Sequence, residues 1–177
     1  MTRQLALTNK KLRGIPRRLR ALKRWSESFQ GCFPEGLSEQ DRYRNIKIPV
    51  NAAIFAPRPG ALSIRKVCAQ LLLDACARLH EAKMRRGIPW RVVTTVCVSD
   101  MFSSEICVYT SEAYFQSHVQ ASENATGKTS IISGRSLARE WGLVLPAGFE
   151  ERGLSYDYRG FQDKDDWDVR EDWYFWD

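Results

Sequence analysis

The sequence predicts an α+β fold, in which a small antiparallel sheet carries one long amphipathic helix on a face and two or three shorter helices elsewhere. Three observations predict it. Residues 62–86 keep an almost unbroken helical periodicity, the runs 90–98 and 105–110 have the composition of paired strands, and shorter segments of both kinds follow. A chain of 177 residues is long enough for one domain with a core of its own.

The charge distribution divides the chain into a basic opening and an acidic ending. The first thirty residues hold nine bases and one acid, whereas from Gly148 onward ten acids face four bases, a local charge of −6. We therefore expect residues 1–14 to be a flexible basic arm and residues 15–177 to be a single globular domain. The acidic aromatic C-terminal segment of that domain is 150–177.

The first elements are a helix and a strand. Pro16 suits the first turn of a helix, and Gly31 suits its end. Between them, apolar residues recur at helical spacing: Leu19, Leu22, Trp25 and Phe29. The stretch 45–55 alternates like a strand, and Pro49 restricts it to an edge or splits it.

The long helix and the strands after it form the centre of the prediction. The helix at 62–86 ends in three bases followed by Gly87, as a helix C-terminus favours. Its apolar stripe predicts packing on a sheet and consists of Ile64, Val67, Cys68, Leu71, Leu72, Ala75, Leu79 and Ala82. The runs 90–98 and 105–110 then predict an antiparallel hairpin.

The remaining segments are shorter. Ser111 and Ser136 are expected to cap two short helices, and residues 120–130 to form an exposed polar loop. This loop contains ATGKTS at 125–130, but position 122 is serine where a phosphate-binding loop needs glycine, so we interpret it as an ordinary loop. The ending alternates in places and predicts one or two strands.

The composition argues against a metal site, a cofactor or a membrane segment. Five cysteines without a C-x-x-C pair suit buried thiols in a reducing cytoplasm better than a disulfide framework, although Cys97 and Cys107 could face each other across the hairpin. His80 and His118 have no catalytic partner nearby in the sequence and are interpreted as structural or surface residues. No uninterrupted apolar run is longer than five residues, so no segment is expected to span a membrane or to act as a secretion signal.

The acidic aromatic segment is the main candidate for recognition, and three interpretations stay open. It could be a core strand with its acids in water, it could fold back on the basic helix, or it could offer aromatic anchors rimmed by acids to a basic partner. The candidate partner-binding residues are Asp163, Asp165, Asp166, Trp167, Asp168, Trp173, Tyr174 and Trp176.

The basic opening supports an alternative, a nucleic-acid-binding module. Clustered bases can neutralise phosphates, although no recognition-helix or base-stacking pattern accompanies them. The candidate contacts are Arg17, Arg18, Arg20, Lys23 and Arg24.

Two blocks and the acidic ending resemble an uncharacterised bacterial domain-of-unknown-function family. The blocks are KKLRGIPRRLRALKRWSESF at 10–29, a basic Arg-Gly-Ile opening with a Leu-rich, Trp-containing helix, and SEICVYTSEAYFQSHV at 104–119. The resemblance implies no catalytic residues. Small cytoplasmic proteins of this kind are often immunity proteins, so we expect a non-catalytic binding protein that neutralises a cognate bacterial toxin with a basic binding face.

Overall fold

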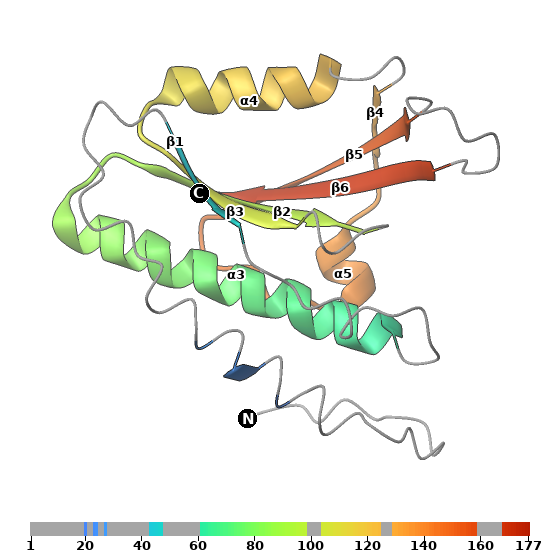
Figure 1. Cartoon of the computed structure of the whole chain (residues 1–177), viewed down its shortest axis with the longest axis horizontal. Coiled ribbons are helices and arrows are strands. Elements are labelled where there is room, and N and C mark those ends of the chain that lie inside the picture. The colour runs from blue at the N-terminus through green and yellow to red at the C-terminus, as the bar shows by residue number, and fades with distance from the viewer. Residues whose placement is uncertain are drawn as a thin grey trace.

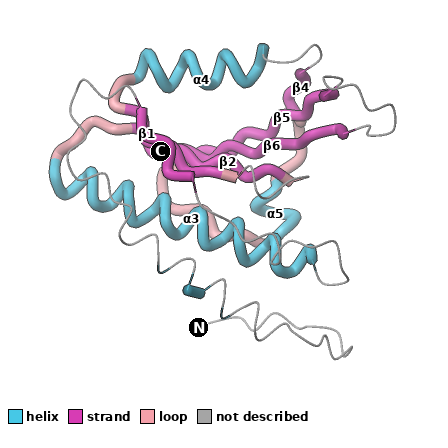
Figure 2. The backbone as a smooth tube through the Cα atoms, in the orientation of Figure 1, coloured by secondary structure: helices cyan, strands magenta, loops and turns pink. Residues whose placement is uncertain are grey.

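The described part of the molecule is an α+β domain in which helices cover both faces of an antiparallel sheet (Figure 1). The computed structural model describes residues 43–47, 61–98, 104–124, 129–158 and 168–177, together with Arg20, Lys23, Arg24 and Glu27. The long helix lies along one face of the sheet with the shortest helix beside it, and the third helix crosses the opposite face. The strands between them are drawn in magenta in Figure 2.

The sheet has the strand order β1-β3-β2-β6-β5-β4, and every neighbouring pair is antiparallel. The strands are β1 Tyr43–Lys47, β2 Arg91–Cys97, β3 Glu105–Tyr109, β4 Thr129–Ile131, β5 Glu150–Tyr158 and β6 Asp168–Trp176. The helices are α3 Ala61–Arg86, α4 Glu112–Asn124 and α5 Leu137–Trp141.

The last strand in the sequence lies near the middle of the sheet. β6 pairs with β2 from Val93↔Trp176 to Cys97↔Asp172, and with β5 from Glu150↔Trp176 to Tyr158↔Asp168. It therefore joins the three strands β1, β3 and β2 to the two strands β5 and β4. The acidic aromatic ending is thus a core strand over residues 168–176.

Alternation along β6 divides its side chains between two apolar clusters. Trp173 and Phe175 are 1% and 0% exposed and pack against α3, in the same cluster as Leu72 and Leu73. Tyr174 points to the other face, where Phe115 of α4 belongs to the second cluster. We call these the α3 face and the α4 face of the sheet.

Most of the predicted elements are confirmed. The helix expected at 62–86 is α3, the predicted hairpin is β2 and β3, and two strands occupy the ending. Ser136 caps α5, since its side chain accepts a hydrogen bond from the Arg139 N–H. The expected strand at 45–55 overlaps β1 at its first residues, and the rest of it lies outside the described residues.

One boundary was wrong. The loop expected at 120–130 is helical as far as Asn124, because α4 continues through 13 residues, and Thr129 already begins β4. The polar residues there are compatible with a helix that contacts the sheet through one side only. The segment 125–128, with most of the lysine- and glycine-containing loop, lies outside the described part, as do the basic arm 1–14 and Cys32.

A close approach of β5 to β6 makes one glycine necessary. A Cβ atom placed on Gly153 would lie 2.6 Å from two ring carbons of Trp173, its partner across the strand pair. Real Cβ atoms do not approach carbon this closely, and the indole is held by the packed core around it. Gly153 therefore provides the space into which the largest buried side chain fits.

We predict that Gly153→Ala lowers the free energy of unfolding by about 1–3 kcal/mol, because the added methyl group overpacks the Trp173 site. Urea denaturation followed by tryptophan fluorescence measures the change. Ser155→Ala, two residues along the same strand, is the control and should change the stability far less. Equal stability of Gly153→Ala and the wild type would contradict this packing.

Candidate functional site

The structure separates the predicted partner-binding residues into two groups. Trp173 and Tyr174 are 1% and 6% exposed and belong to the core, while Trp176 is partly buried against Phe115 at a ring distance of 5.7 Å. These side chains support the sheet in the described fold. Asp168 is the first residue of β6, and its side chain is not described; the others, Asp163, Asp165, Asp166 and Trp167, lie outside the described residues.

The register of β5 with β6 shows which part of the chain contains the four residues that are not described. The strands stay paired to Tyr158↔Asp168, so residues 159–167 are the connection of this hairpin. The acids Asp163, Asp165 and Asp166 and the tryptophan Trp167 are all part of it. The connection starts and ends on two nine-residue strands that are fixed in the sheet.

A buried polar cluster lies on the α4 face close to this end of the hairpin. Its centre is the Asp172 carboxylate, in a residue that is 4% exposed. Asp172 Oδ1 accepts hydrogen bonds from the Arg170 Nε–H at 3.1 Å and from the Cys97 thiol at 2.8 Å, and Oδ2 accepts one from the Tyr156 hydroxyl. Arg170 Nη2 also donates to Cys97 Sγ at 2.7 Å.

The electrostatics of this cluster keep its weak acids protonated. Burial raises the pKa of the Cys97 thiol, and the Asp172 charge raises it further. Burial and the hydrogen bond to Asp172 likewise raise the pKa of Tyr156. Burial alone would lower the pKa of Arg170, but Asp172 and Cys97 raise it by more, so the guanidinium stays charged. One positive and one negative charge therefore face each other, with neutral donors around them.

This arrangement of hydrogen bonds holds side chains of β2, β5 and β6 together, and it is poorly suited to proton transfer. A nucleophilic cysteine needs a lowered pKa and access to substrate, whereas Cys97 is fully buried with a raised pKa. A general base needs a free lone pair directed at substrate, whereas the Asp172 carboxylate already accepts three hydrogen bonds.

The other thiols are equally protected. Cys68 and Cys76 are buried on the α3 face, and burial raises the pKa of Cys68 to about 12. Cys107 lies opposite Val93 and not opposite Cys97, so these two thiols do not face each other across the hairpin. The prediction of buried free thiols is confirmed for the four cysteines in the described part.

His118 belongs to the aromatic packing under α4. Its ring lies 5.3 Å from that of Tyr109 and 5.9 Å from that of Tyr174. Burial lowers its pKa, with a smaller opposing effect of Glu105. Its neutral imidazole thus fills the space between the helix and the sheet, as expected of a structural histidine.

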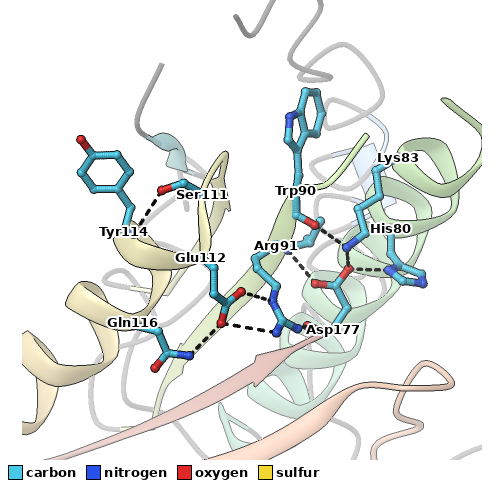
Figure 3. A network of polar contacts seen from close by, with 10 residues as sticks. His80, Lys83, Trp90, Arg91, Ser111, Glu112, Tyr114, Gln116 and Asp177 are labelled. Atoms are coloured by element: carbon cyan, nitrogen blue, oxygen red, sulfur yellow. Dashed lines mark hydrogen bonds and ion pairs between the residues drawn. The ribbon is translucent and has the colours of Figure 1, made fainter. Parts of the chain in front are cut away.

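The far end of β6 carries a second buried carboxylate, shown in Figure 3. Asp177 forms an ion pair with Lys83 of α3 and accepts hydrogen bonds from His80 Nδ1 of the same helix and from the Val92 N–H, the latter at 2.9 Å. Arg91 donates to the Asp177 backbone oxygen and reaches Glu112 of α4 at 2.9 Å. One short segment therefore connects α3, β2, β6 and α4.

The sequence analysis missed both carboxylates as buried residues. The sequence signal for Asp172 was weak, because it is the last of three consecutive charged residues, 170–172, and directly precedes the aromatic run 173–176. Asp177 carried no sequence signal, because its partners His80 and Lys83 are nearly a hundred residues away.

The alternative nucleic-acid contacts are only partly described. Arg20, Lys23 and Arg24 are exposed, and Lys23 pairs with Glu27 at 3.9 Å across one helical turn. Arg17 and Arg18 lie outside the described residues.

The described residues contain no group of three or more His, Cys, Asp or Glu side chains placed to hold a metal ion. Within the same part of the chain, no helix has the length and apolar character needed to cross a membrane.

Residues 23–177 match the model of the family described as "Protein of unknown function (DUF3916)". The match covers α3 to α5 and all six strands. No curated protein and no solved structure matches the chain.

We predict that Asp177→Asn lowers the free energy of unfolding by about 3 kcal/mol at neutral pH, because it leaves Lys83 buried without its counter-charge. Burial alone would raise the pKa of Asp177, but Lys83, the Val92 N–H and His80 lower it by more, so its pKa in the fold is lowered. The carboxylate therefore stabilises the fold above the ordinary carboxyl pKa of about 4, and this contribution is lost as the pH falls through the lower folded-state value.

Urea denaturation of the wild type and Asp177→Asn between neutral and acid pH measures this effect. The difference between the two proteins should shrink as the pH falls. Glu81→Gln, an exposed position on the same helix, is the control and should behave as the wild type. A difference that stays constant down to acid pH would contradict the assignment of the effect to the Asp177 charge.

Proposed function

This chain belongs to the DUF3916 family, and we propose that it is a non-catalytic binding protein that recognises a basic protein partner. In its most concrete form, the proposal is an immunity protein of the bacterial cytoplasm that occludes a cognate toxin. The connection between β5 and β6 is the recognition segment.

The hairpin register is the observation that carries the proposal. Because β5 and β6 stay paired to Tyr158↔Asp168, the acids and Trp167 fall in a connection between two fixed strands. Binding residues are frequently found in such connections, positioned by a rigid scaffold. The connection 159–167 has three acids and two bases, and the strand residues Asp157 and Asp168 at its two ends bring the local charge to −3, which suits a cationic surface.

The polar cluster at Asp172 supports a role without catalysis. Its thiol and phenol have raised pKa values, and its carboxylate is occupied by three donors. Such a cluster fixes β6 next to β2 and β5. It thereby holds in place the strand ends from which the recognition segment starts.

The proposal that the partner is a toxin rests on the family resemblance given above and on the acidic charge of the recognition segment. Many toxins neutralised by small immunity proteins act on nucleic acids or nucleotides and need a basic substrate-binding face. An acidic segment with a tryptophan could cover such a face, because acids accelerate the encounter and a buried tryptophan contributes most of the affinity.

We predict that replacing Asp163, Asp165 and Asp166 by Asn slows association with the partner at low salt about tenfold or more, since these acids steer the encounter. Trp167→Ala should weaken the equilibrium affinity about thirtyfold, the loss expected of an interface anchor worth about 2 kcal/mol. The test uses the purified product of the neighbouring gene, with stopped-flow for the rates and calorimetry for the affinity.

The matched control replaces two exposed acids of α3, Asp74→Asn with Glu81→Gln, which changes the net charge without touching the hairpin. It should bind as the wild type, and all variants should keep the wild-type melting temperature. If the wild type does not bind the neighbouring gene product, the toxin proposal fails. If it binds and the connection variants bind equally well, the recognition segment lies elsewhere.

The exposed side chains of Arg20, Lys23 and Arg24 favour one alternative, binding of nucleic acid. This function predicts retardation of RNA or DNA in a mobility-shift titration at low salt, lost on replacement of the three bases by Gln. The affinity should also fall steeply as salt rises, because bound phosphates release counterions. Under our proposal, the protein does not retard RNA or DNA even at about 50 mM salt, a concentration at which contacts to phosphate are strong.

A further inference from the structure

Helix α4 is held on the sheet by one narrow stripe of side chains. Among residues 112–121, only Phe115, His118 and Val119 are buried or half-buried, and the others are exposed. Their spacing of three and four residues places them on one side of the helix, which crosses the face of the sheet opposite α3 (Figure 1). The middle residue of this stripe is titratable, so the contact between helix and sheet can respond to pH.

The His118 ring lies against two buried tyrosine rings of the sheet. Its centroid is 5.3 Å from that of Tyr109 on β3 and 5.9 Å from that of Tyr174 on β6. The two tyrosines are 3% and 6% exposed and belong to the same apolar cluster as Phe115. A neutral imidazole suits these surroundings, whereas an imidazolium loses its hydration there.

One acid and one base of the sheet face the same contact. Glu105 of β3 favours the protonated form of His118, but burial has the larger and opposite effect, so the pKa of His118 is lowered. Arg152 of β5 pairs with Tyr174 across the strands, on the same face, and its positive charge does not favour a second one nearby. On α4 itself, Glu112 is held at β2 by an ion pair of 2.9 Å. These charges leave the neutral imidazole favoured in the folded protein.

The two phenols supply no charge. Tyrosine ionises at a pH of about 10 in water, and burial raises the pKa of Tyr109 further. The contact of His118 with Tyr109 and Tyr174 is therefore one between uncharged rings at neutral pH. Because a histidine in water has a pKa of about 6.5, a fall in pH below this value favours any state in which His118 returns to water.

The first turn of α4 has contacts that do not titrate in this range. Glu112 pairs with Arg91 of β2, and this pair lowers the pKa of Glu112. The Arg91 guanidinium also lies 5.3 Å from the centre of the Phe115 ring, and Phe115 contacts Trp176 at a ring distance of 5.7 Å. The helix thus has an anchor at its start that mild acid does not change, followed by a contact at His118 that mild acid weakens.

We propose that His118 makes the part of α4 from residue 118 onward a pH-sensitive cover of the sheet. In mildly acid solution this part leaves the α4 face and uncovers Tyr109 and Tyr174, while the anchor at Glu112 and Phe115 stays in place. This device is a property of the helix and of the strands under it, and it does not involve the recognition segment.

Hydrogen exchange of the full chain between about pH 7.5 and about pH 5.5 tests the proposal, with rates corrected for the intrinsic pH dependence of amide exchange. Protection of the amides 118–124 should fall about three- to tenfold over this range, because their opening takes up one proton. The amides of β2 should stay more protected than these at every pH. Protection that does not change with pH, or amides 118–124 that open only together with β2, would overturn the proposal.

The chain has two histidines, so the variants of one can be compared with a variant of the other. His118→Phe keeps an aromatic ring and His118→Gln keeps a polar side chain, and each removes the titration, so both should abolish the pH dependence. His80→Gln, on α3 beside Asp177, should keep it. A pH dependence that survives in the His118 variants, or that His80→Gln abolishes, assigns the effect to another group and contradicts the role of His118.

Discussion

The fold depends on the insertion of β6 between β2 and β5. Without this strand, the sheet order would break into a group of three strands and a group of two, each with an unpaired edge. Backbone N–H and C=O groups at such edges are satisfied only by water or by another chain. The insertion also places Trp173 and Phe175 against α3, so the main core closes only when the last strand is paired.

Two buried carboxylates lie along the same strand, Asp172 at its centre and Asp177 directly after its last residue. Asp172 is satisfied by Cys97, Arg170 and Tyr156, and Asp177 by groups of α3 and β2. Burying a charge is expensive unless donors surround it, and each of these acids has at least three. Paired in this way, the two acids specify the position of β6 relative to its neighbours, because a shift of one residue would separate each acid from its donors.

The sequence predicted the elements whose signal is local. The stripe of α3, the β-branched run of β2 and the capping Ser136 each require only short-range periodicity or one side-chain contact. It could not predict which of three interpretations applied to the ending, because Trp173 on an inner strand and Trp173 on an exposed strand have the same local sequence. That choice depends on the pairing of β6 with β2, which joins positions about 80 residues apart. The extent of α4 was missed because its polar C-terminal half resembles a loop.

The candidate site likewise has one part that the local sequence predicted and one part that depends on long-range strand pairing. The acidic composition of the recognition segment was visible in the sequence, whereas the cluster at Asp172 arises only when β2, β5 and β6 are brought together. The structure assigns the buried aromatics of β6 to the core and, on our proposal, leaves recognition to the connection before it. A clasp between the two charged ends would involve residues outside the described part.

Native-state hydrogen exchange of the β6 amides tests this account most directly. If β6 closes the sheet, the amides of Trp173, Tyr174 and Phe175 should be among the slowest to exchange. They should open with the same free energy as those of β2, in a single global unfolding event. If β6 instead exchanges through a local opening at much lower free energy while β2 stays protected, the strand is an attached tail, and the central claim is wrong.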